Sequence, residues 1–272
     1  MSLQTTTVEG LLGEPEINNW LVPELLERGD RVIFTGREGK GKSTLLRQIG
    51  YRLSVGLHPF VERPIQPCKV AYIDLENSRA QVRRALRRLY LTAGVISPMH
   101  LILEPAGLNL LTRASECLPV LDAIQPDVII AGPMYKLAYD LRDEEASARI
   151  AAVIDAWRQR YSCCVLLESH QPHETSDGEG RYRPERPFGS SLWMRWPEFG
   201  FCLEDSGLLR PWRGPREERD WPLKLKRGEP DKWPWMADSL HCLNCGTELP
   251  GTDKFCSLEC SLAYSERKKK KG

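Results

Sequence analysis

A glycine-rich segment at residues 36–43, with the sequence "GREGKGKS", restricts the possible folds of this chain more than any other stretch. It follows the apolar run "RVIFT" and leads into "TLLRQIGYRL", whose apolar spacing predicts a helix. The segment matches GxxxxGK[ST] in full, between a strand and a helix as a phosphate-binding loop requires. Its glycines let successive backbone N–H groups point at phosphate oxygens, and the helix dipole adds positive potential. The alternative is a glycine-rich turn that matches by chance.

Two side chains at the end of this loop have predicted roles in binding a nucleoside triphosphate. Lys42 would contact the β and γ phosphates, and the Ser43 hydroxyl would hold Mg²⁺. We therefore predict that ATP and Mg²⁺ are bound by a continuous run of residues: Gly36, Arg37, Glu38, Gly39, Lys40, Gly41, Lys42, Ser43 and Thr44.

Short apolar runs alternate with helical patterns along most of the chain. Strands are predicted at 31–36, 69–76, 99–104, 127–132 and 163–170, and helices at 42–55, 78–93, 114–124 and 143–160. This alternation predicts an α/β fold with a mostly parallel sheet and helices on both faces. After residue 198, "FGFCLEDS", "LLRPWRG" and "WPLKLKRG" follow one another without a helix between them, which predicts antiparallel strands at one edge of the sheet.

Composition limits the remaining possibilities. The 272 residues carry a formal net charge of +1, which argues against a uniformly basic coat, so any polyanion site must be local. No apolar run is long enough to cross a bilayer and the first residues lack a secretory pattern, so a cytoplasmic protein without membrane contact is expected. We predict a large α/β domain at 1–236, a small cysteine-rich module at 237–265 and a basic tail at 266–272.

Carboxylates that could assist hydrolysis lie at the end of the strand in "VAYIDLENS". Asp74 and Glu76 are two residues apart, so they point to the same side beyond the strand. Glu76 is the candidate for polarising the attacking water, the alternative being an ordinary solvated carboxylate. In the strand "DVIIAG", Gly132 occupies the position where a Walker B aspartate is expected, and Asp127 lies at the opposite end.

With these features the chain resembles the RecA-type ATPases, most closely the RepA-like hexameric replicative helicases of phages and plasmids. The similar segments are "LLERGDRVIFTGREGKGKSTLLRQI", "VAYIDLEN", "DVIIAGPMYKL", "VLLESHQPH", "FGSSLWMRW" and "WPLKLKRG", within roughly residues 17–235. The resemblance implies that Glu76 is catalytic and that His170 senses the γ phosphate, although a lone histidine at a strand end is an equal alternative. It also implies a ring in which Lys226 or Arg227 of a neighbour reaches the γ phosphate, the alternative being a solvated edge strand. Because Gly132 departs from the family pattern, either Asp74 or a water shell would replace the missing Mg²⁺ ligand, or turnover would be slow.

Single-stranded DNA is the partner that the resemblance implies. Its contacts would come from Lys136 and from the loop with Arg181, Arg183 and Arg186, where Tyr182 suits base stacking. A plain solvated loop is the alternative.

The C-terminal segment contains a separate motif. Cys242, Cys245, Cys256 and Cys260 have the spacing of a closed four-thiolate Zn²⁺ site, which would be structural. The module could bind a replication protein, and the tail "RKKKK" could touch DNA or remain solvated.

These features together predict an ATP-hydrolysing, oligomeric DNA helicase of phage or plasmid replication. One alternative is a non-motor ATPase that acts as a recombination mediator or helicase loader. The other is a zinc-module adaptor with weak ATPase activity.

Overall fold

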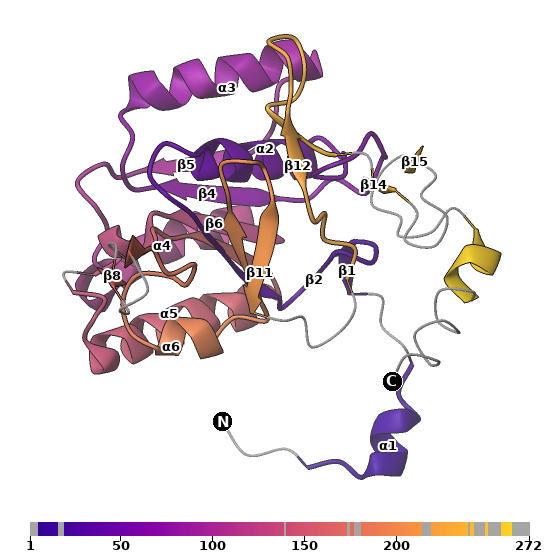
Figure 1. Cartoon of the computed structure of the whole chain (residues 1–272). Helices are drawn as coiled ribbons and strands as arrows, with labels where there is room; N and C mark the ends of the chain where they lie inside the picture. Colours follow the sequence, from indigo (N-terminus) through magenta and orange to yellow (C-terminus); the bar gives the residue numbers. More distant parts are fainter. Residues whose placement is uncertain are drawn as a thin grey trace.

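The predicted apolar strands form one seven-stranded sheet in the order β11-β10-β3-β7-β6-β4-β5 (Figure 1). The computed structural model describes residues 5–15, 19–138, 140–172, 175–176, 181–213, 219–238, 240–241, 248–249 and 257–262. The strands of the sheet are β3 (Arg31–Thr35), β4 (Val70–Asp74), β5 (His100–Leu103), β6 (Val128–Gly132), β7 (Cys164–Glu168), β10 (Phe199–Leu203) and β11 (Leu209–Arg213). All neighbours pair in parallel except β11, which runs antiparallel to β10. The mostly parallel sheet predicted from the sequence is therefore confirmed.

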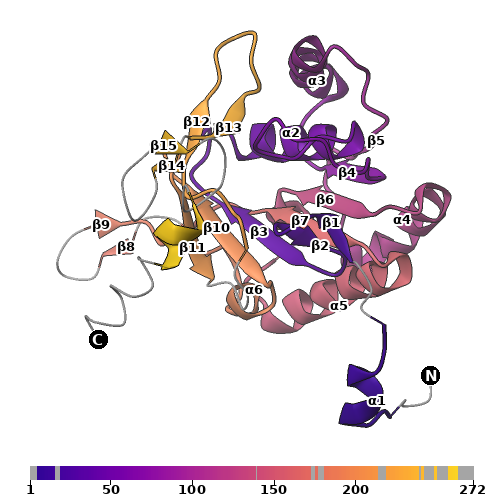
Figure 2. The same cartoon turned by 90° about the vertical axis from the view of Figure 1, so that its right-hand side faces the viewer.

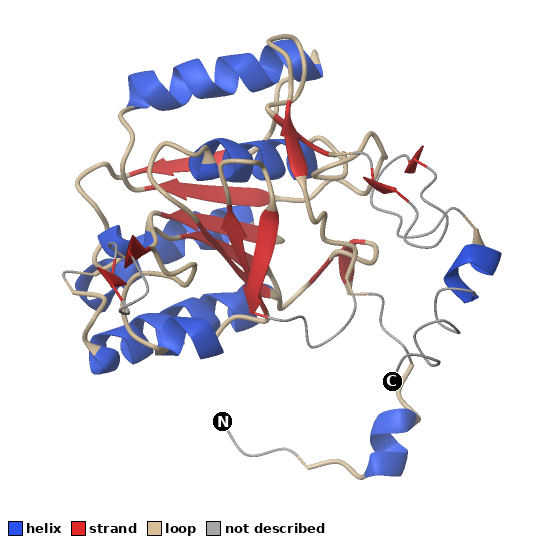
Figure 3. Ribbon diagram, in the orientation of Figure 1, coloured by secondary structure: helices blue, strands red, loops and turns tan. Residues whose placement is uncertain are grey.

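Helices cover both faces of this sheet (Figures 2 and 3). One face packs against α4 (Leu110–Ile124), α5 (Glu144–Tyr161) and α6 (Leu192–Arg195), with the 3-10 turn η1 (Met134–Lys136) at its edge. The other face packs against α2 (Lys42–Ser54) and the hairpin of β1 (Trp20–Val22) and β2 (Leu26–Glu27). The helix α3 (Arg79–Ala93) packs on α2 rather than on the sheet itself, through a small cluster that contains Tyr51 and Leu89. The inner strands β3, β4, β6, β7 and β10 are buried on both faces, which is why they read as continuous apolar runs.

Two local predictions differ from the structure. Helix α4 begins at Leu110, not near 114, because the side chain of Asn109 caps the amide of Leu111. The strand β12 (Leu225–Arg227) does not extend the main sheet but pairs with β13 (Trp235–Ala237). That hairpin lies over α2 because the Gln48 side chain hydrogen-bonds both the backbone N–H and the C=O of Trp235.

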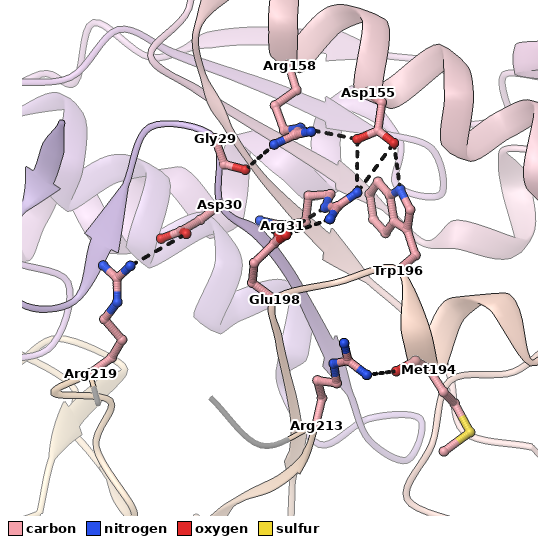
Figure 4. Close-up of polar contacts among 10 residues, drawn as sticks. All are labelled: Gly29, Asp30, Arg31, Asp155, Arg158, Met194, Trp196, Glu198, Arg213 and Arg219. Atoms are coloured by element: carbon pink, nitrogen blue, oxygen red, sulfur yellow. Dashed lines mark hydrogen bonds and ion pairs between the residues drawn. The ribbon is translucent and has the colours of Figure 1, made fainter. Parts of the chain in front are cut away.

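An ionic network anchors the N-terminal end of β3, the strand that leads to the glycine-rich loop (Figure 4). Arg31 donates to Glu198 just before β10, with Nε to Oε2 at 3.0 Å, and to Asp155 on α5 at 3.2 Å. Asp155 also accepts from Arg158 and from the indole of Trp196. The network ties β3 to a helix on one side and to the neighbouring strand on the other, so the loop leaves from a fixed strand.

The remaining elements are short. They are the helix α1 (Val8–Leu12) and the strands β8 (Thr175–Ser176), β9 (Arg181–Tyr182), β14 (Leu240–His241) and β15 (Glu248–Leu249). Residues 258–262 form one further helical turn. Among the described residues, no helix is both long and apolar enough to span a membrane.

Candidate nucleotide-binding site

The glycine-rich loop connects the C-terminal end of β3 to the first residue of α2. Gly41 is the N-cap of α2 and has φ of 94°, a left-handed conformation that favours glycine. A Cβ at Gly41 would also lie 2.9 Å from the guanidinium nitrogens of Arg227. The predicted strand, loop and helix are therefore present, and the N–H groups of the first turn of α2 face the loop.

Lys42 lies inside the loop with 3% of its surface exposed. Its Nζ donates to the carbonyl oxygens of Gly36 and Arg37, each at 2.8 Å. Burial lowers the pKa of Lys42, while the nearby carboxylates of Glu168 and Glu38 oppose this shift. The ammonium group is therefore already positioned within the loop by backbone acceptors, at the place where phosphates bind in this motif.

An ion pair links the loop to the segment that follows β7. Glu38 accepts from both terminal nitrogens of Arg183, at 2.8 and 2.9 Å. The hydrogen bond from Arg183 lowers the pKa of Glu38 to about 2. Arg183 also donates to the carbonyl oxygens of Gln171 and Pro172, so the guanidinium is fixed above the loop. In this structure Arg183, a predicted DNA contact, forms its hydrogen bonds with the nucleotide-binding loop and with the segment that follows β7.

The two predicted catalytic side chains, Glu76 and His170, are joined through Tyr135. The Tyr135 hydroxyl donates to Glu76 Oε1 at 3.0 Å, and its ring packs on His170 with centroids 5.4 Å apart. His170 Nδ1 lies 3.5 Å from Glu38 Oε1, and this buried nitrogen has no hydrogen bond from the described residues. Burial lowers the pKa of His170, and the Lys42 charge lowers it further, so the imidazole is neutral near pH 7. The structure thus brings Glu76 and His170 to the same edge of the sheet as the loop.

Asp74 does not have the contacts expected of a Mg²⁺ ligand. Its Oδ2 accepts from Arg47 at 2.7 Å, and its Oδ1 accepts from the backbone and the side chain of Asn77. Burial raises the pKa of Asp74, but these hydrogen bonds outweigh it and the pKa is below its usual range. The carboxylate is 2% exposed and its oxygens are taken by protein donors. The predicted role of Asp74 in Mg²⁺ binding is therefore not supported by its surroundings.

Glu168, the last residue of β7, was missed by the sequence reasoning. Its Oε1 accepts from the Ser43 hydroxyl at 2.8 Å, although the two residues are 125 positions apart. Only 4% of its surface is exposed. The available signal was a carboxylate at the end of an otherwise apolar strand, but the prediction selected His170, two residues later.

The predicted basic residues of β12 lie on opposite sides of their strand. Arg227 Nη2 donates to the carbonyl oxygen of Lys40 at 2.7 Å, and its guanidinium stacks on Trp235 at 3.8 Å. Trp235 in turn donates to the carbonyl oxygen of Gly41. Arg227 thus contacts the loop of its own chain, whereas the prediction had it reach the site of a neighbour. Lys226 is exposed.

Two of the other predicted nucleic-acid contacts lie near backbone carbonyl oxygens. Lys136 Nζ lies 3.4 Å from the carbonyl oxygen of Pro105, and Arg186 lies near the carbonyl oxygen of Pro187. The side chains of Arg181 and Tyr182 lie outside the described part of the structure.

Most of the predicted zinc site cannot be placed. Cys242, Cys245 and Cys256 lie outside the described residues, and Cys260 lies in the helical turn at 258–262. The described residues contain no cluster of three or more His, Cys, Asp or Glu side chains arranged for a metal ion.

The residues at the loop fit a triphosphate with Mg²⁺. A buried ammonium, a helix N-terminus and an unsatisfied imidazole nitrogen face the loop, which suits anionic oxygens. The oxygens of Ser43 and Glu168 are the hard donors that Mg²⁺ prefers. Bound Mg²⁺ neutralises charge that develops on the β and γ phosphates during transfer.

Comparisons with known proteins support this interpretation at the level of family and fold. Residues 1–176 match a family model described as "AAA domain", and residues 238–272 match one described as "Probable treble clef". The crystal structure of a KaiC-like protein from the hyperthermophilic archaeon Pyrococcus horikoshii OT3 is similar, with a TM-score of 0.50 and 15% sequence identity. That match covers 77% of this chain and 90% of the other. A comparison with curated proteins finds no significant match.

These findings confirm the RecA-type part of the predicted resemblance and do not single out the RepA-like helicases. At 15% identity the structural likeness shows the fold alone. The AAA-domain match, in contrast, covers more than half of the residues. The chain therefore belongs to this AAA-domain family and has the fold of a RecA-like P-loop ATPase.

Proposed function

We propose that the chain hydrolyses ATP at the loop of residues 36–44, with Glu76 polarising the attacking water. The observation that carries this proposal is the convergence of Lys42, Ser43, Glu168 and Glu76 at one edge of the sheet, from the ends of the two strands β4 and β7 and from the first turn of α2. Glu76 is exposed and accepts a hydrogen bond from Tyr135, which orients the carboxylate without neutralising it. His170 is the candidate sensor of the γ phosphate because its uncharged Nδ1 faces the loop.

We further propose that hydrolysis is coupled to single-stranded DNA, and that the chain is a helicase of phage or plasmid replication. The support is a cationic face on α3, which is the outermost helix on its side of the sheet (Figure 1). Five arginines of this helix are exposed and form no ion pair with any described residue: Arg79, Arg83, Arg84, Arg87 and Arg88. No acidic residue occurs from 79 to 103.

The spacing of these arginines suits a row of phosphates. Arg79, Arg83 and Arg87 are four residues apart, which places them on one helix face at intervals of about 6 Å. Guanidinium groups bind phosphate oxygens through paired hydrogen bonds, and each phosphate contact releases counterions. This surface is a further candidate contact for DNA, in addition to the residues predicted from the sequence.

Assembly into a ring is part of the same proposal. A single chain with one cationic helix binds DNA weakly, whereas a ring multiplies the contacts. Since Arg227 contacts the loop of its own chain, Lys226 on the opposite side of β12 is the better candidate to reach a neighbour's γ phosphate.

We also propose that the C-terminal module binds structural Zn²⁺ through Cys242, Cys245, Cys256 and Cys260. The support is the spacing of these cysteines and the treble-clef match. We propose further that this module recruits a replication protein.

One experiment tests the main proposal. The ATPase rate per chain is measured against protein concentration, with and without single-stranded DNA, for the wild type and for Glu76→Gln. A rate that rises with concentration and with DNA, and is lost in the variant, supports an oligomeric DNA-coupled ATPase. Strand displacement by the wild type then identifies a helicase. Nucleotide-dependent DNA binding without displacement identifies a non-motor mediator or loader, and a rate at background excludes both in favour of an adaptor.

A further inference from the structure

The C-terminal end of β6 has no side chain because a neighbouring side chain occupies the space. Gly132 ends β6, and a Cβ built there would lie 2.4 Å from the Cβ of Glu168 on the adjacent strand β7. Atoms of this kind do not approach so closely, so any residue other than glycine at 132 would displace Glu168. The absence of a side chain at position 132 and the presence of Glu168 therefore depend on each other, because the two side chains would occupy the same space.

Glu168 reaches the residue that holds Mg²⁺ in P-loop proteins. It pairs in register with Phe34 of β3, the strand that leads into the loop. Its own strand, β7, is therefore one strand closer to the loop than β6. From there its Oε1 accepts from the Ser43 hydroxyl at 2.8 Å. In P-loop ATPases Mg²⁺ is held by this hydroxyl together with an aspartate at the end of a nearby strand. In this chain a longer side chain on the next strand brings a carboxylate to the same hydroxyl.

The surroundings of Glu168 leave capacity for a cation. It forms no ion pair with a lysine or arginine of the described chain, and no described residue donates to its Oε2. Burial raises the pKa of Glu168, while the charges of Lys42 and Arg47 and the Ser43 hydroxyl lower it. A buried carboxylate with one hydrogen bond is poorly compensated unless a cation or proton joins it. The other buried carboxylate at this edge, Asp74, is already compensated by Arg47.

We propose that Glu168 is the carboxylate that binds nucleotide-associated Mg²⁺ in this chain, and that Gly132 is glycine to make room for it. The proposal rests on the proposed nucleotide site and specifies one of its ligands. It accounts for the departure at position 132 without invoking Asp74 or slow turnover. The carboxylate acts either directly on the ion or through an ion-bound water, together with Ser43 and the phosphates.

Metal affinity provides the test, because it is independent of turnover. Mn²⁺ serves as the probe, since it accepts the same oxygen ligands as Mg²⁺ and is visible by electron paramagnetic resonance. Mn²⁺ is titrated into wild type and Glu168→Gln in the presence of saturating ADP, and ADP affinity without metal is measured by calorimetry. Gln keeps the size and the acceptor for Ser43 but loses the negative charge. We expect Mn²⁺ affinity to fall about 10- to 100-fold, with metal-free ADP affinity within about twofold of wild type.

Moving the carboxylate from β7 to β6 tests the relation between positions 132 and 168. Glu168→Gly removes the Cβ that blocks position 132, and Gly132→Asp in the same chain returns a carboxylate to β6. The residual approaches of the new Cβ to the backbone of residue 168 are 3.3 Å, which a shift of a few tenths of an ångström relieves. The double variant should bind Mn²⁺ more tightly than Glu168→Gly alone. Glu116→Gln, on the exposed face of α4, is the control and should match wild type.

Each outcome decides the question. Wild-type Mn²⁺ affinity in Glu168→Gln overturns the assignment while leaving the nucleotide site intact. A folded double variant that binds Mn²⁺ no better than Glu168→Gly overturns the proposed relation between positions 132 and 168. A wild type that binds no ADP with or without metal overturns both the nucleotide site and this inference, so the two failures are distinguishable.

Discussion

Asp30, immediately before β3, offers a quantitative test of how burial acts on a carboxylate in this fold. It is 6% exposed, its carboxylate faces Arg219 (Figure 4), and its Oδ2 accepts from the Glu27 amide at 2.7 Å. Burial raises its pKa to about 6, with Glu27 and Glu198 adding to the rise, although the Glu27 amide and the charge of Arg219 4.0 Å away oppose it. Because the folded pKa lies above the unfolded value of 3.8, the native state holds the proton longer between pH 4 and 6. The free energy of unfolding therefore falls as pH rises through this window.

The magnitude follows from the size of the shift. A difference of about two pKa units corresponds to about 3 kcal/mol, as an upper limit reached above pH 6. Asp30→Asn removes the titration while keeping an acceptor for the Glu27 amide. We expect the free energy of unfolding of Asp30→Asn, relative to wild type, to increase between pH 4 and pH 7 by up to this amount. The ionised carboxylate alone attracts Arg219, and this attraction is already included in the folded pKa of Asp30, so it adds no separate dependence on pH.

Equilibrium urea unfolding, followed by tryptophan fluorescence at a series of pH values, measures this difference. Asp122→Asn provides a control of opposite sign, because hydrogen bonds from Arg160 and Tyr161 lower the pKa of Asp122. The stability contribution of Asp122 is present above its unfolded pKa and is lost as pH falls. A difference between Asp30→Asn and wild type that stays flat from pH 4 to pH 7, or decreases, would refute the reasoning about Asp30.

Three further predictions concern the binding sites. Lys42→Ala should lower the ATPase rate by about 100-fold, because the ammonium inside the loop is lost; a malachite green assay measures it, and a rate near wild type would contradict the site. Arg83→Gln with Arg87→Gln should weaken DNA binding and reduce the salt slope by about 0.7 per lost contact. Fluorescence anisotropy at several salt concentrations measures this, with Arg142→Gln as the control; an unchanged slope would count against the α3 surface. Cys242→Ser should release the zinc ion, as detected with a colorimetric chelator, while Mg-ATP binding persists; zinc retention would argue against the four-cysteine site.

Local patterns in the sequence were sufficient to predict most of the elements. The loop at 36–43 and the helix after it follow from glycine spacing and from apolar residues at helical intervals, both of which act within a few residues. The strands β4, β6 and β7 were found because burial on both faces demands continuous apolar runs. The predicted start of α4 was several residues too late, because Asn109 caps this helix through a hydrogen bond that apolar spacing does not reveal.

The partners of the charged residues depended on the order of strands, which no local pattern contains. Asp74 was predicted to face the nucleotide, but α2 brings Arg47 against it and the carboxylate is neutralised there. Arg227 was predicted to serve a neighbour, but the hairpin of β12 and β13 folds it onto its own loop. In both cases an arginine side chain binds a carboxylate or carbonyl oxygen that is close to it in space but distant in the sequence.

The sequence by itself determined that this chain has a phosphate-binding loop in an α/β sheet, since a strand, a glycine turn and a helix start are encoded in adjacent residues. It also showed that position 132 lacks the expected carboxylate. Only the tertiary structure showed that Glu168 lies beside that glycine and contacts Ser43. The physical reason is that β6 and β7 are neighbours in space, so the side chain of one strand can occupy the volume left by the other.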